Sequence, residues 1–343
     1  MRKSSLLFLV FLLIGCFYAT HALAQRIDVN EVTILNAITP DFQVNENAGT
    51  NGASQSNPSI AADGSGNYIM TWGDERNGDG DIYAQRYSSD WTAMGGNFKV
   101  SDDTSSASQS SPSVAADGNG NFIIAWDDGR NGDGDIYAQR YSSDGTAMGV
   151  NFNVNDDTSS ASQSSPSVAA DGNGNVIITW RDYRNGDSDI YAQRYSSDGT
   201  PVGSNFKAND DTDNATQVQT FIAADGSGNF IIAWRDGRNG QHIYAQRYSS
   251  DGTAVGSNFN VTDDAGFAFR RWPSISTDRN GSFIITWFES RNPDWDIYAQ
   301  RYSSDGTPVG SNFKVSDDTS SVSLANPSIA AGWQREFYHH MAG

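Results

Sequence analysis

The chain is poor in cysteine, histidine and basic residues, and each shortage excludes a class of protein. Its only cysteine is Cys16, so the chain beyond it cannot contain an internal disulfide, and packing and hydrogen bonds must stabilise it. The 4 histidines form no zinc motif, and no Gly-x-Ser-x-Gly elbow occurs. Lys and Arg total 22 against 41 Asp and Glu, a net charge of −19. Such a surface repels the phosphates of nucleic acid, so we expect no nucleic-acid partner.

Long apolar runs are missing after the N-terminal segment 1–24. There, Arg2-Lys3 precedes the apolar run Leu6–Tyr18, and Ala22-Leu23-Ala24 follows it as a small-x-small cleavage signal, which is the pattern of a secretory signal peptide. The run is shorter than the roughly 20 residues that span a bilayer, so we expect no transmembrane span. The sequence therefore predicts an exported bacterial protein. Leu13-Ile14-Gly15-Cys16 resembles a lipobox, so an outer-membrane lipoprotein anchored through Cys16 is the alternative.

One repeated sequence fills most of the remaining chain. The phrase Ile-Tyr-Ala-Gln-Arg-Tyr-Ser-Ser-Asp recurs at steps of 54, 54, 53 and 54 residues, from Ile82 to Ile297. A second phrase, Trp-x-(Asp/Glu)-x-Arg-Asn, keeps the same spacing from Trp72 to Trp287. A repeat of this period is typical of architectures in which each unit buries its faces against its neighbours.

Each repeat has the pattern of four short strands. In the second repeat these are Pro112–Ala116, the apolar run Phe122–Trp126, the alternating run Ile136–Tyr141 and Asn151–Val154. The segments between them are rich in Gly, Asn, Asp and Ser, which favour tight turns. Four antiparallel strands per unit are typical of a β-propeller blade, whereas a β-sandwich needs about seven. We therefore predict an all-β propeller.

The repeats resemble those of known propeller families. Pro-x-(Ile/Val)-Ala-x-Asp-x-x-Gly-Asn followed by an apolar strand is similar to the first half of an NHL blade. Ser-Ser-Asp-Gly-Thr at 142–146 is similar to part of the sialidase Asp-box, without its final Trp, so the repeats also resemble sialidase/TolB-like blades. The resemblance implies that the Pro-Ser-Val strand is innermost and the Asn-Phe-x-Val strand outermost. It implies little about function, because such blades occur in enzymes, lectins and scaffolds.

The two ends of the repeat region predict a sixth blade. Asp41–Asn45 matches an outermost strand, Arg26–Leu35 could supply the strand before it, and Asn326–Ala331 matches an innermost strand. Five whole blades plus one assembled from both ends would close a ring and hide the open sheet edges. The expected division is a signal peptide at 1–24, a propeller at 25–331 and a degenerate or truncated tail at 332–343.

Two repeats carry an acidic, glycine-containing loop that resembles a calcium-binding segment. Its alternating carboxylates are how proteins present oxygen ligands to a hard cation, although the distal Glu of an EF-hand is missing. Turn-forming Asp and Gly explain the loop equally well, so we expect no cofactor, with calcium as the alternative. The candidate ligands are Asp79, Asp81, Asp133 and Asp135. Just before this loop, Asp128 and Arg130 recur in every repeat with few changes, and we expect a structural ion pair.

The fifth repeat departs most from the template. It reads Phe267-Ala268-Phe269-Arg270-Arg271-Trp272 where others read Ser-Ala-Ser-Gln-Ser-Ser, and it adds aromatic residues in a neighbouring loop. In the expected blade order the two segments emerge on one face, where aromatic rings beside arginine could stack on a sugar or anchor a protein. Ordinary aromatic packing between blades is the alternative. The candidate ligand-binding residues are Phe269, Arg271, Trp272, Phe288 and Trp295.

The repetition itself bears on function, since a feature present in every blade is more typical of a scaffold than of an active site. Glutamates are few, and only Glu289 lies in a repeated phrase. We therefore expect a non-catalytic binding or scaffold protein, secreted or on the cell surface, with a glycan or protein ligand. The alternative is a secreted, sialidase-like glycoside hydrolase or lyase, because Asp is plentiful and the spacing of a carboxylate pair is invisible in a sequence.

Overall fold

The protein is described from a computed structural model, in which strands are the only regular secondary structure of the described residues. No helix among the described residues is long and apolar enough to cross a membrane. The predicted signal peptide, Cys16 included, lies outside the described residues except for Ala24. The described ranges are 24–27, 32–35, 42–45, 52–212, 214–238, 240–262, 268–291, 294–316, 325–331 and 337–342.

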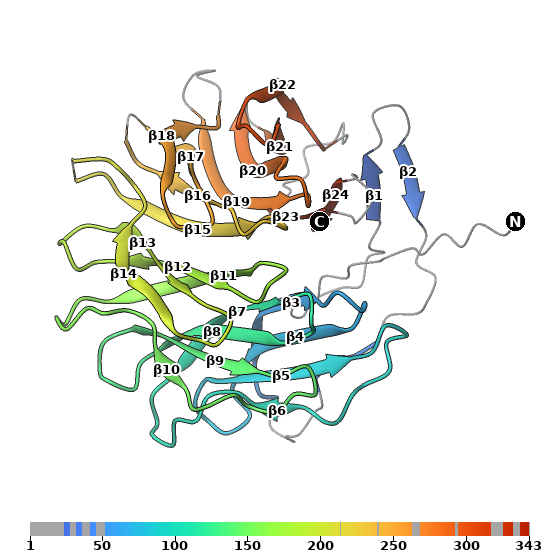
Figure 1. The fold of residues 1–343 in the computed structure, drawn as a ribbon, viewed down its shortest axis with the longest axis vertical. Helices are drawn as coiled ribbons and strands as arrows, with labels where there is room; N and C mark the ends of the chain where they lie inside the picture. Colours follow the sequence, from blue (N-terminus) through green and yellow to red (C-terminus); the bar gives the residue numbers. More distant parts are fainter. Residues whose placement is uncertain are drawn as a thin grey trace, which may run out of the picture.

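Five antiparallel sheets, each built from four consecutive strands, follow one another round a ring (Figure 1). Blade one contains β3 (Gln55–Ala62), β4 (Tyr68–Asp74), β5 (Asp81–Tyr87) and β6 (Phe98–Lys99). Blade two contains β7 (Gln109–Ala116), β8 (Phe122–Asp128), β9 (Asp135–Tyr141) and β10 (Phe152–Asn153). Blade three contains β11 (Gln163–Ala170), β12 (Val176–Asp182), β13 (Asp189–Tyr195) and β14 (Pro201–Lys207). Blade four contains β15 (Gln217–Ala224), β16 (Phe230–Asp236), β17 (His242–Tyr248) and β18 (Ala254–Asn260). Blade five contains β19 (Phe269–Thr277), β20 (Phe283–Arg291), β21 (Asp294–Tyr302) and β22 (Pro308–Lys314).

The chain is thus a β-propeller with four-stranded blades, as the repeats predict. The first strands of successive blades contact one another, from β3 and β7 to β15 and β19, and lie at the centre of the ring (Figure 1). The fourth strands lie at its outer edge. The expected order within a blade, with the Pro-Ser-Val strand innermost, is therefore confirmed.

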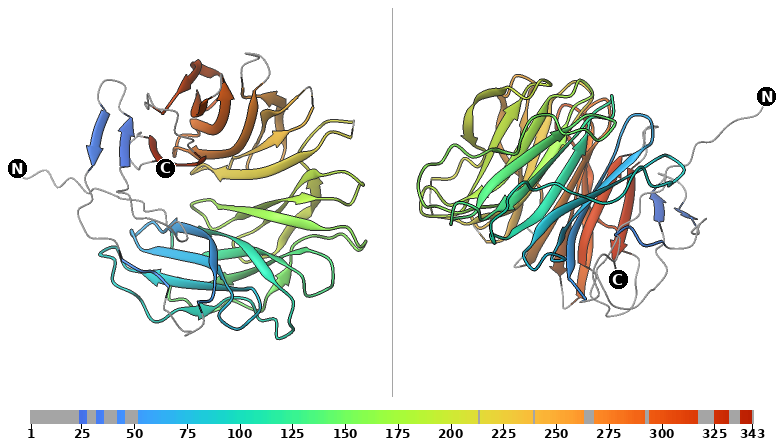
Figure 2. Two further views of the ribbon diagram at one scale, coloured as in Figure 1. Left: turned by 180° about the vertical axis from the view of Figure 1, so that it is seen from behind. Right: turned by 90° about the horizontal axis from the view of Figure 1, so that it is seen from below.

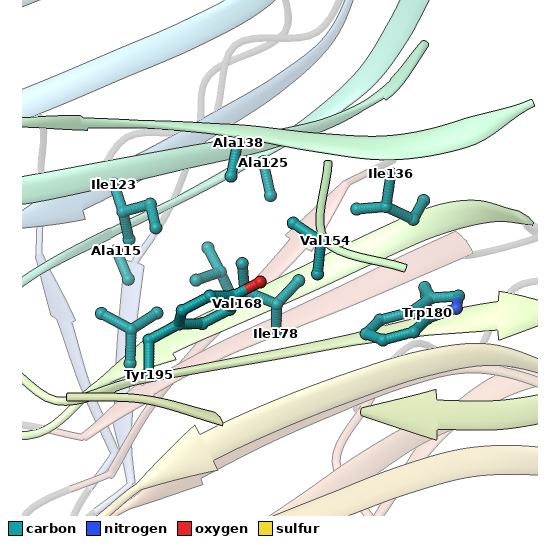
Figure 3. Close-up of a cluster of buried hydrophobic side chains, with 11 residues drawn as sticks. Ala115, Ile123, Ala125, Ile136, Ala138, Val154, Val168, Ile178, Trp180 and Tyr195 are labelled. Atoms are coloured by element: carbon teal, nitrogen blue, oxygen red, sulfur yellow. The ribbon is translucent and has the colours of Figure 1, made fainter. Parts of the chain in front are cut away.

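The core lies between blades, because the middle strands are apolar on both faces. Between blades two and three, Ile136 and Val154 of one sheet pack against Ile178 and Trp180 of the next (Figure 3). The Trp180 side chain is completely buried. Side chains alternate across a strand, so each Trp faces the preceding blade and the residue after it faces the following blade.

The innermost strand of every full blade contains a bulge at the end nearest the Trp. The repeated Pro is replaced by Thr in blade four. The residue before this position takes a positive φ between 48° and 58° in every full blade, and the register with the second strand shifts there. A positive φ is uncommon in a residue other than glycine, costs roughly 1–3 kcal/mol, and often marks a functional site. The five bulge residues are Asn57, Ser111, Ser165, Gln219 and Trp272.

Both ends of the chain meet in one further four-stranded sheet, the terminal sheet, of order β2-β1-β24-β23 (Figures 1 and 2). Its strands are β1 (Ala24–Ile27), β2 (Val32–Leu35), β23 (Ala325–Ala331) and β24 (Phe337–Ala342). β1 pairs antiparallel with β24, and β23 contacts β19, β20 and β21 of blade five. β24 lies within the segment 332–343 that was expected to be a tail.

The segment Asp41–Asn45 was expected to be the outermost strand of the last blade; Asp41 lies outside the described residues, and 42–45 form no strand of the terminal sheet. These residues pack on blade one, where Phe42 meets Tyr87 edge-on with ring centroids 5.7 Å apart. This contact repeats that of Phe98 with Tyr141 between blades one and two, at 5.5 Å.

Candidate functional site

The residue after each Trp differs in character from blade to blade. This residue points to the following blade, and in blade two it meets the bulge of the next blade's innermost strand. The set therefore lies at one end of the central channel that a propeller encloses. The acidic residue that follows this position is nearly constant, because each Trp indole donates a hydrogen bond to the carboxylate two residues later, at 2.6–2.9 Å. From blade one to blade five the residues directly after the Trp are Gly73, Asp127, Arg181, Arg235 and Phe288.

Asp127 is the one carboxyl group in this set. Its side chain is partly buried between blades two and three and accepts a hydrogen bond of 2.7 Å from the backbone N–H of Ser165, a bulge residue. Burial raises the pKa of Asp127 to about 7, although the hydrogen bonds from Ser165, Ser111 and Ser110 oppose the shift. A carboxyl group with this pKa exchanges protons near neutral pH, as an acid or base catalyst must.

Two arginines, Arg235 of blade four and Arg271 of blade five, lie near each other at the same end of the channel. Trp234 packs towards blade three, so Arg235, the next residue of β16, faces blade five. Burial lowers the pKa of Arg235, and the nearby charge of Arg271 lowers it further. Neither arginine forms a hydrogen bond or an ion pair within the described residues, and the Arg271 Nε is buried without a partner.

The aromatic residues singled out in the fifth repeat do come together. Phe288 stacks on Trp295 with ring centroids 4.5 Å apart, and Trp272 lies 5.6 Å from Phe288 on the other side. Phe269 stacks on Trp295 at 6.3 Å and is 44% exposed. Phe288 itself is buried and serves packing, whereas Trp272 and Trp295 keep partly exposed edges. Arg271 pairs with Phe288 in the register of β19 and β20, so it adjoins this aromatic cluster.

The acidic loops expected to bind calcium use their carboxylates elsewhere. Asp81 forms an ion pair of 2.6 Å with Lys99 and accepts a hydrogen bond from Asn77. Asp135 accepts hydrogen bonds from Asn131 and Asn155. Asp133 is exposed and Asp79 partly exposed, and no group of three or more potential metal-ligating side chains gathers in the part of the chain that the structure describes.

Calcium binding by these loops stays a prediction, and the geometry argues against it. We expect the melting temperature to move by less than about 1 °C when millimolar calcium or EDTA is added, since a ligand that binds only the folded state must raise it. A calcium-dependent rise of several degrees, lost in an Asp79→Asn/Asp133→Asn variant, would show that the loops are metal sites.

The repeated Asp and Arg after the Trp strand form the expected structural ion pair. Arg130 contacts Asp128 of its own blade at 2.7 Å and Asp102, at the end of blade one, at 2.8 Å. Its guanidinium also stacks on the Tyr137 ring, 4.1 Å from the centroid. These contacts fasten the loop to two blades, as a structural role requires.

Asp127 and Arg235 were not predicted from the sequence. The available signal was the variability of their position, which Gly, Asp, Arg and Phe occupy, although the residue three after the Trp varies as much. A position that changes character from blade to blade in a repeat protein breaks the symmetry, as an asymmetric site requires.

Comparisons with known proteins show likeness at the level of the fold. No family model and no curated protein sequence matches the chain. A protein of unknown function from Dyadobacter fermentans has a TM-score of 0.53 at 9% identity, over 85% of this chain and 95% of that one. An α-L-arabinofuranosidase of Fusarium graminearum, solved with arabinobiose, has a TM-score of 0.53 at 10% identity, over 83% and 92%. A PL25 ulvan lyase, solved with a -[GlcA(1-4)Rha3S]- ligand, has a TM-score of 0.54 at 11% identity, over 83% and 78%.

These comparisons correct the expectation of a non-catalytic binding or scaffold module. Two propellers of assigned function that the chain resembles are a glycosidase and a polysaccharide lyase, which fit the alternative of a hydrolase or lyase better. The error arose because repetition was taken as a sign of scaffold. Repetition describes most positions of the blades, whereas the positions after the Trp residues are individual.

Proposed function

We propose that the protein is a carbohydrate-active enzyme that cleaves the glycosidic bonds of a polysaccharide at the bulge end of its channel. The observation that carries the proposal is Asp127, a partly buried carboxyl group with a pKa raised to about 7, set against the strained Ser165 backbone. Strained backbone and a strongly shifted pKa both gather at active sites. The likeness to propellers that act on carbohydrates supports the same reaction class.

Asp127 would serve as the proton donor. Both hydrolysis and elimination need a proton on the leaving oxygen, and a carboxyl group that is half protonated near pH 7 supplies it. The hydroxyls of Ser110 and Ser111 and the N–H of Ser165 hold the group in place. The equivalent positions in the other four full blades carry no carboxyl group, so one residue of the set has this role.

The direct test is a panel of plant and algal polysaccharides with reducing-end and ultraviolet detection. We expect new reducing ends from at least one polymer. Elimination also creates an unsaturated sugar that absorbs in the ultraviolet, whereas hydrolysis does not, so the two detections assign the reaction. Failure to cleave any neutral or acidic polymer in the panel, by a protein with an intact melting transition, would refute the proposal.

We further propose that the terminal sheet closes the ring as a sixth blade and that the protein acts outside the cytoplasm, after export by the N-terminal segment. Closure is supported by the pairing of β1 with β24, by the contacts of β23 with blade five, and by the packing of residues 42–45 on blade one. Asn45 also donates a hydrogen bond of 3.2 Å to Gln55, as Asn155 does to Gln163 at 3.0 Å between blades two and three.

If the ring is closed, Phe42 and Phe98 should contribute equally to the free energy of unfolding. Each ring packs on a Tyr of the following blade, so Phe42→Ala and Phe98→Ala should each lower the free energy of unfolding by on the order of 2 kcal/mol, less than a fully buried Phe. Urea denaturation measures both. A Phe42→Ala loss below about 0.5 kcal/mol beside a normal loss for Phe98→Ala would mean that the ring is open at this point.

A further inference from the structure

The neighbouring arginines Arg235 of blade four and Arg271 of blade five are unusual in a protein with 41 acidic residues and 22 basic ones. Other arginines of the ring have hydrogen-bond acceptors. Arg184 and Arg238 pair with Asp182 and Asp236 at 2.8 and 2.9 Å, and an arginine in the third strand of blades one to four donates to backbone carbonyls of the next blade. Arg235 and Arg271 lack such a partner within the described residues and lie close enough to repel each other. Placing two like charges together without a counter-ion costs stability, and proteins keep such pairs where an anion binds.

The backbone holds the two arginines at one place. Arg235 of β16 is paired with Val218 of β15, which directly precedes the bulge residue Gln219. The Gln219 side chain accepts a hydrogen bond of 2.9 Å from the N–H of Trp272, the next bulge residue, and Arg271 directly precedes Trp272. A hydrogen bond across the blade boundary therefore joins the segment that pairs with Arg235 to the segment that carries Arg271.

The aromatic cluster lies beside this pair. Trp272 follows Arg271 in the chain, and its ring packs on Phe288, which is the register partner of Arg271. Trp272 and Trp295 keep partly exposed ring surface. An aromatic ring offers a stacking surface for the apolar face of a sugar, and a guanidinium binds an oxyanion through two parallel N–H donors.

We propose that Arg235, Arg271 and Trp272 form a subsite for an acidic sugar residue, so that the substrate is an anionic polysaccharide. The shared chemistry is a carboxylate or sulfate oxyanion on a sugar ring that stacks against the aromatic cluster. This inference rests on the proposed function only in calling the ligand a substrate, because binding of the acidic sugar can be measured without cleavage. Asp127 lies between blades two and three, so a polymer would cross the channel end from the anion subsite to the proton donor.

The test measures binding of defined hexasaccharides by calorimetry. The probes are galacturonate, mannuronate, guluronate and glucuronate-containing oligomers, each beside its methyl ester, and a sulfated neutral oligomer beside its desulfated form. We expect at least one anionic probe to bind about 10-fold or more tightly than its neutral counterpart. Uronate and sulfate arms show which oxyanion the subsite prefers. Equal affinities within every pair would overturn the proposal.

The variants Arg235→Gln and Arg271→Gln should each weaken the anionic probe about 10-fold and together abolish the preference over the neutral form. Arg279→Gln, at an exposed arginine in a turn of the same blade, removes the same charge from the surface and should leave the preference intact. Because each single variant removes one of two charges that repel each other, its melting temperature should be unchanged or higher. A preference that survives the double change, or a melting temperature that falls by several degrees in both single variants, would show that the arginines are structural.

The two proposals fail independently. Asp127→Asn should keep the anionic preference while losing cleavage. Binding without any cleavage by the unmodified protein would preserve the subsite and refute the enzyme. Cleavage of neutral polymers alone, with no preference for anionic probes in binding, would preserve the enzyme and refute the subsite.

Discussion

Replacing Asp127 with asparagine should lower kcat on the cleaved polysaccharide about 10²- to 10⁴-fold and, at pH 8, make the protein more stable. The loss of activity follows from removing the proton donor, while the amide keeps the size of the carboxyl group and can still accept the Ser165 N–H. The gain in stability follows from the cost of ionising a partly buried carboxyl group. If Asp127 served only to stabilise the fold, its replacement would lower stability and would not combine a loss of activity with a gain in stability.

The pH dependence follows from the raised pKa. Burial moves the pKa of Asp127 from 3.8 to about 7, so between these values the folded protein keeps a proton that the unfolded chain has released. The free energy of unfolding contributed by this group therefore falls as pH rises from about 4 to about 7 and is level above that, by about 2–4 kcal/mol in all. The amide of the Asp127→Asn variant cannot ionise, so the variant lacks this loss.

Urea denaturation at pH 5, 6, 7 and 8 measures the effect, with the variant gaining on the unmodified protein as pH rises. kcat should decline above about pH 7 in the unmodified protein, since the donor loses its proton. Asp144→Asn is the matched control, because that exposed carboxylate has its pKa lowered to about 2 by the Ser142 hydroxyl and the Thr146 N–H. The control should keep activity and gain no stability at pH 8. Full activity in the Asp127 variant would remove it from the mechanism.

The fold could be predicted from the sequence because each repeat records its own environment. The apolar run before each Trp predicts a strand covered on both faces, and the structure buries Trp126, Trp180 and Trp234 completely between blades. The end of the chain was harder to interpret. β24 (Phe337–Ala342) departs from the template, and its pairing with β1 brings together residues more than three hundred positions apart, which no local pattern encodes.

The candidate site was predictable in part. Trp272 and Trp295 stood out as departures from a strict template, and the structure places both in one aromatic cluster. Asp127 could not be recognised, because its pKa depends on burial against the Ser165 bulge of the next blade, a tertiary contact. Arg235 was missed for the same reason, since only the ring brings it beside Arg271.

Blade five carries an Arg–Glu pair where blades three and four carry a Gln–Asp pair. We expect the Gln–Asp pair to be tolerated in blade five only when both residues are changed together. In blade four, Gln217 donates a weak hydrogen bond of 3.5 Å to Asp236, and blade three repeats this with Gln163 and Asp182 at 3.4 Å. In blade five the equivalents are Arg270 and Glu289, which form an ion pair of 3.1 Å. Both side chains are almost completely buried, at 1% and 0% exposure.

Arg270→Gln alone should lower the free energy of unfolding by about 3–5 kcal/mol, because it takes the Arg270 cation from a buried carboxylate. The double variant Arg270→Gln/Glu289→Asp restores the pair found in blades three and four and should recover to within about 1 kcal/mol of the unmodified protein. The shorter carboxylate can still accept the Trp287 indole N–H, as Asp236 accepts that of Trp234 at 2.8 Å. Urea denaturation of the two singles and the double completes the cycle. A double variant no more stable than Arg270→Gln alone would mean that blade five depends on this ion pair in a way that the other blades do not.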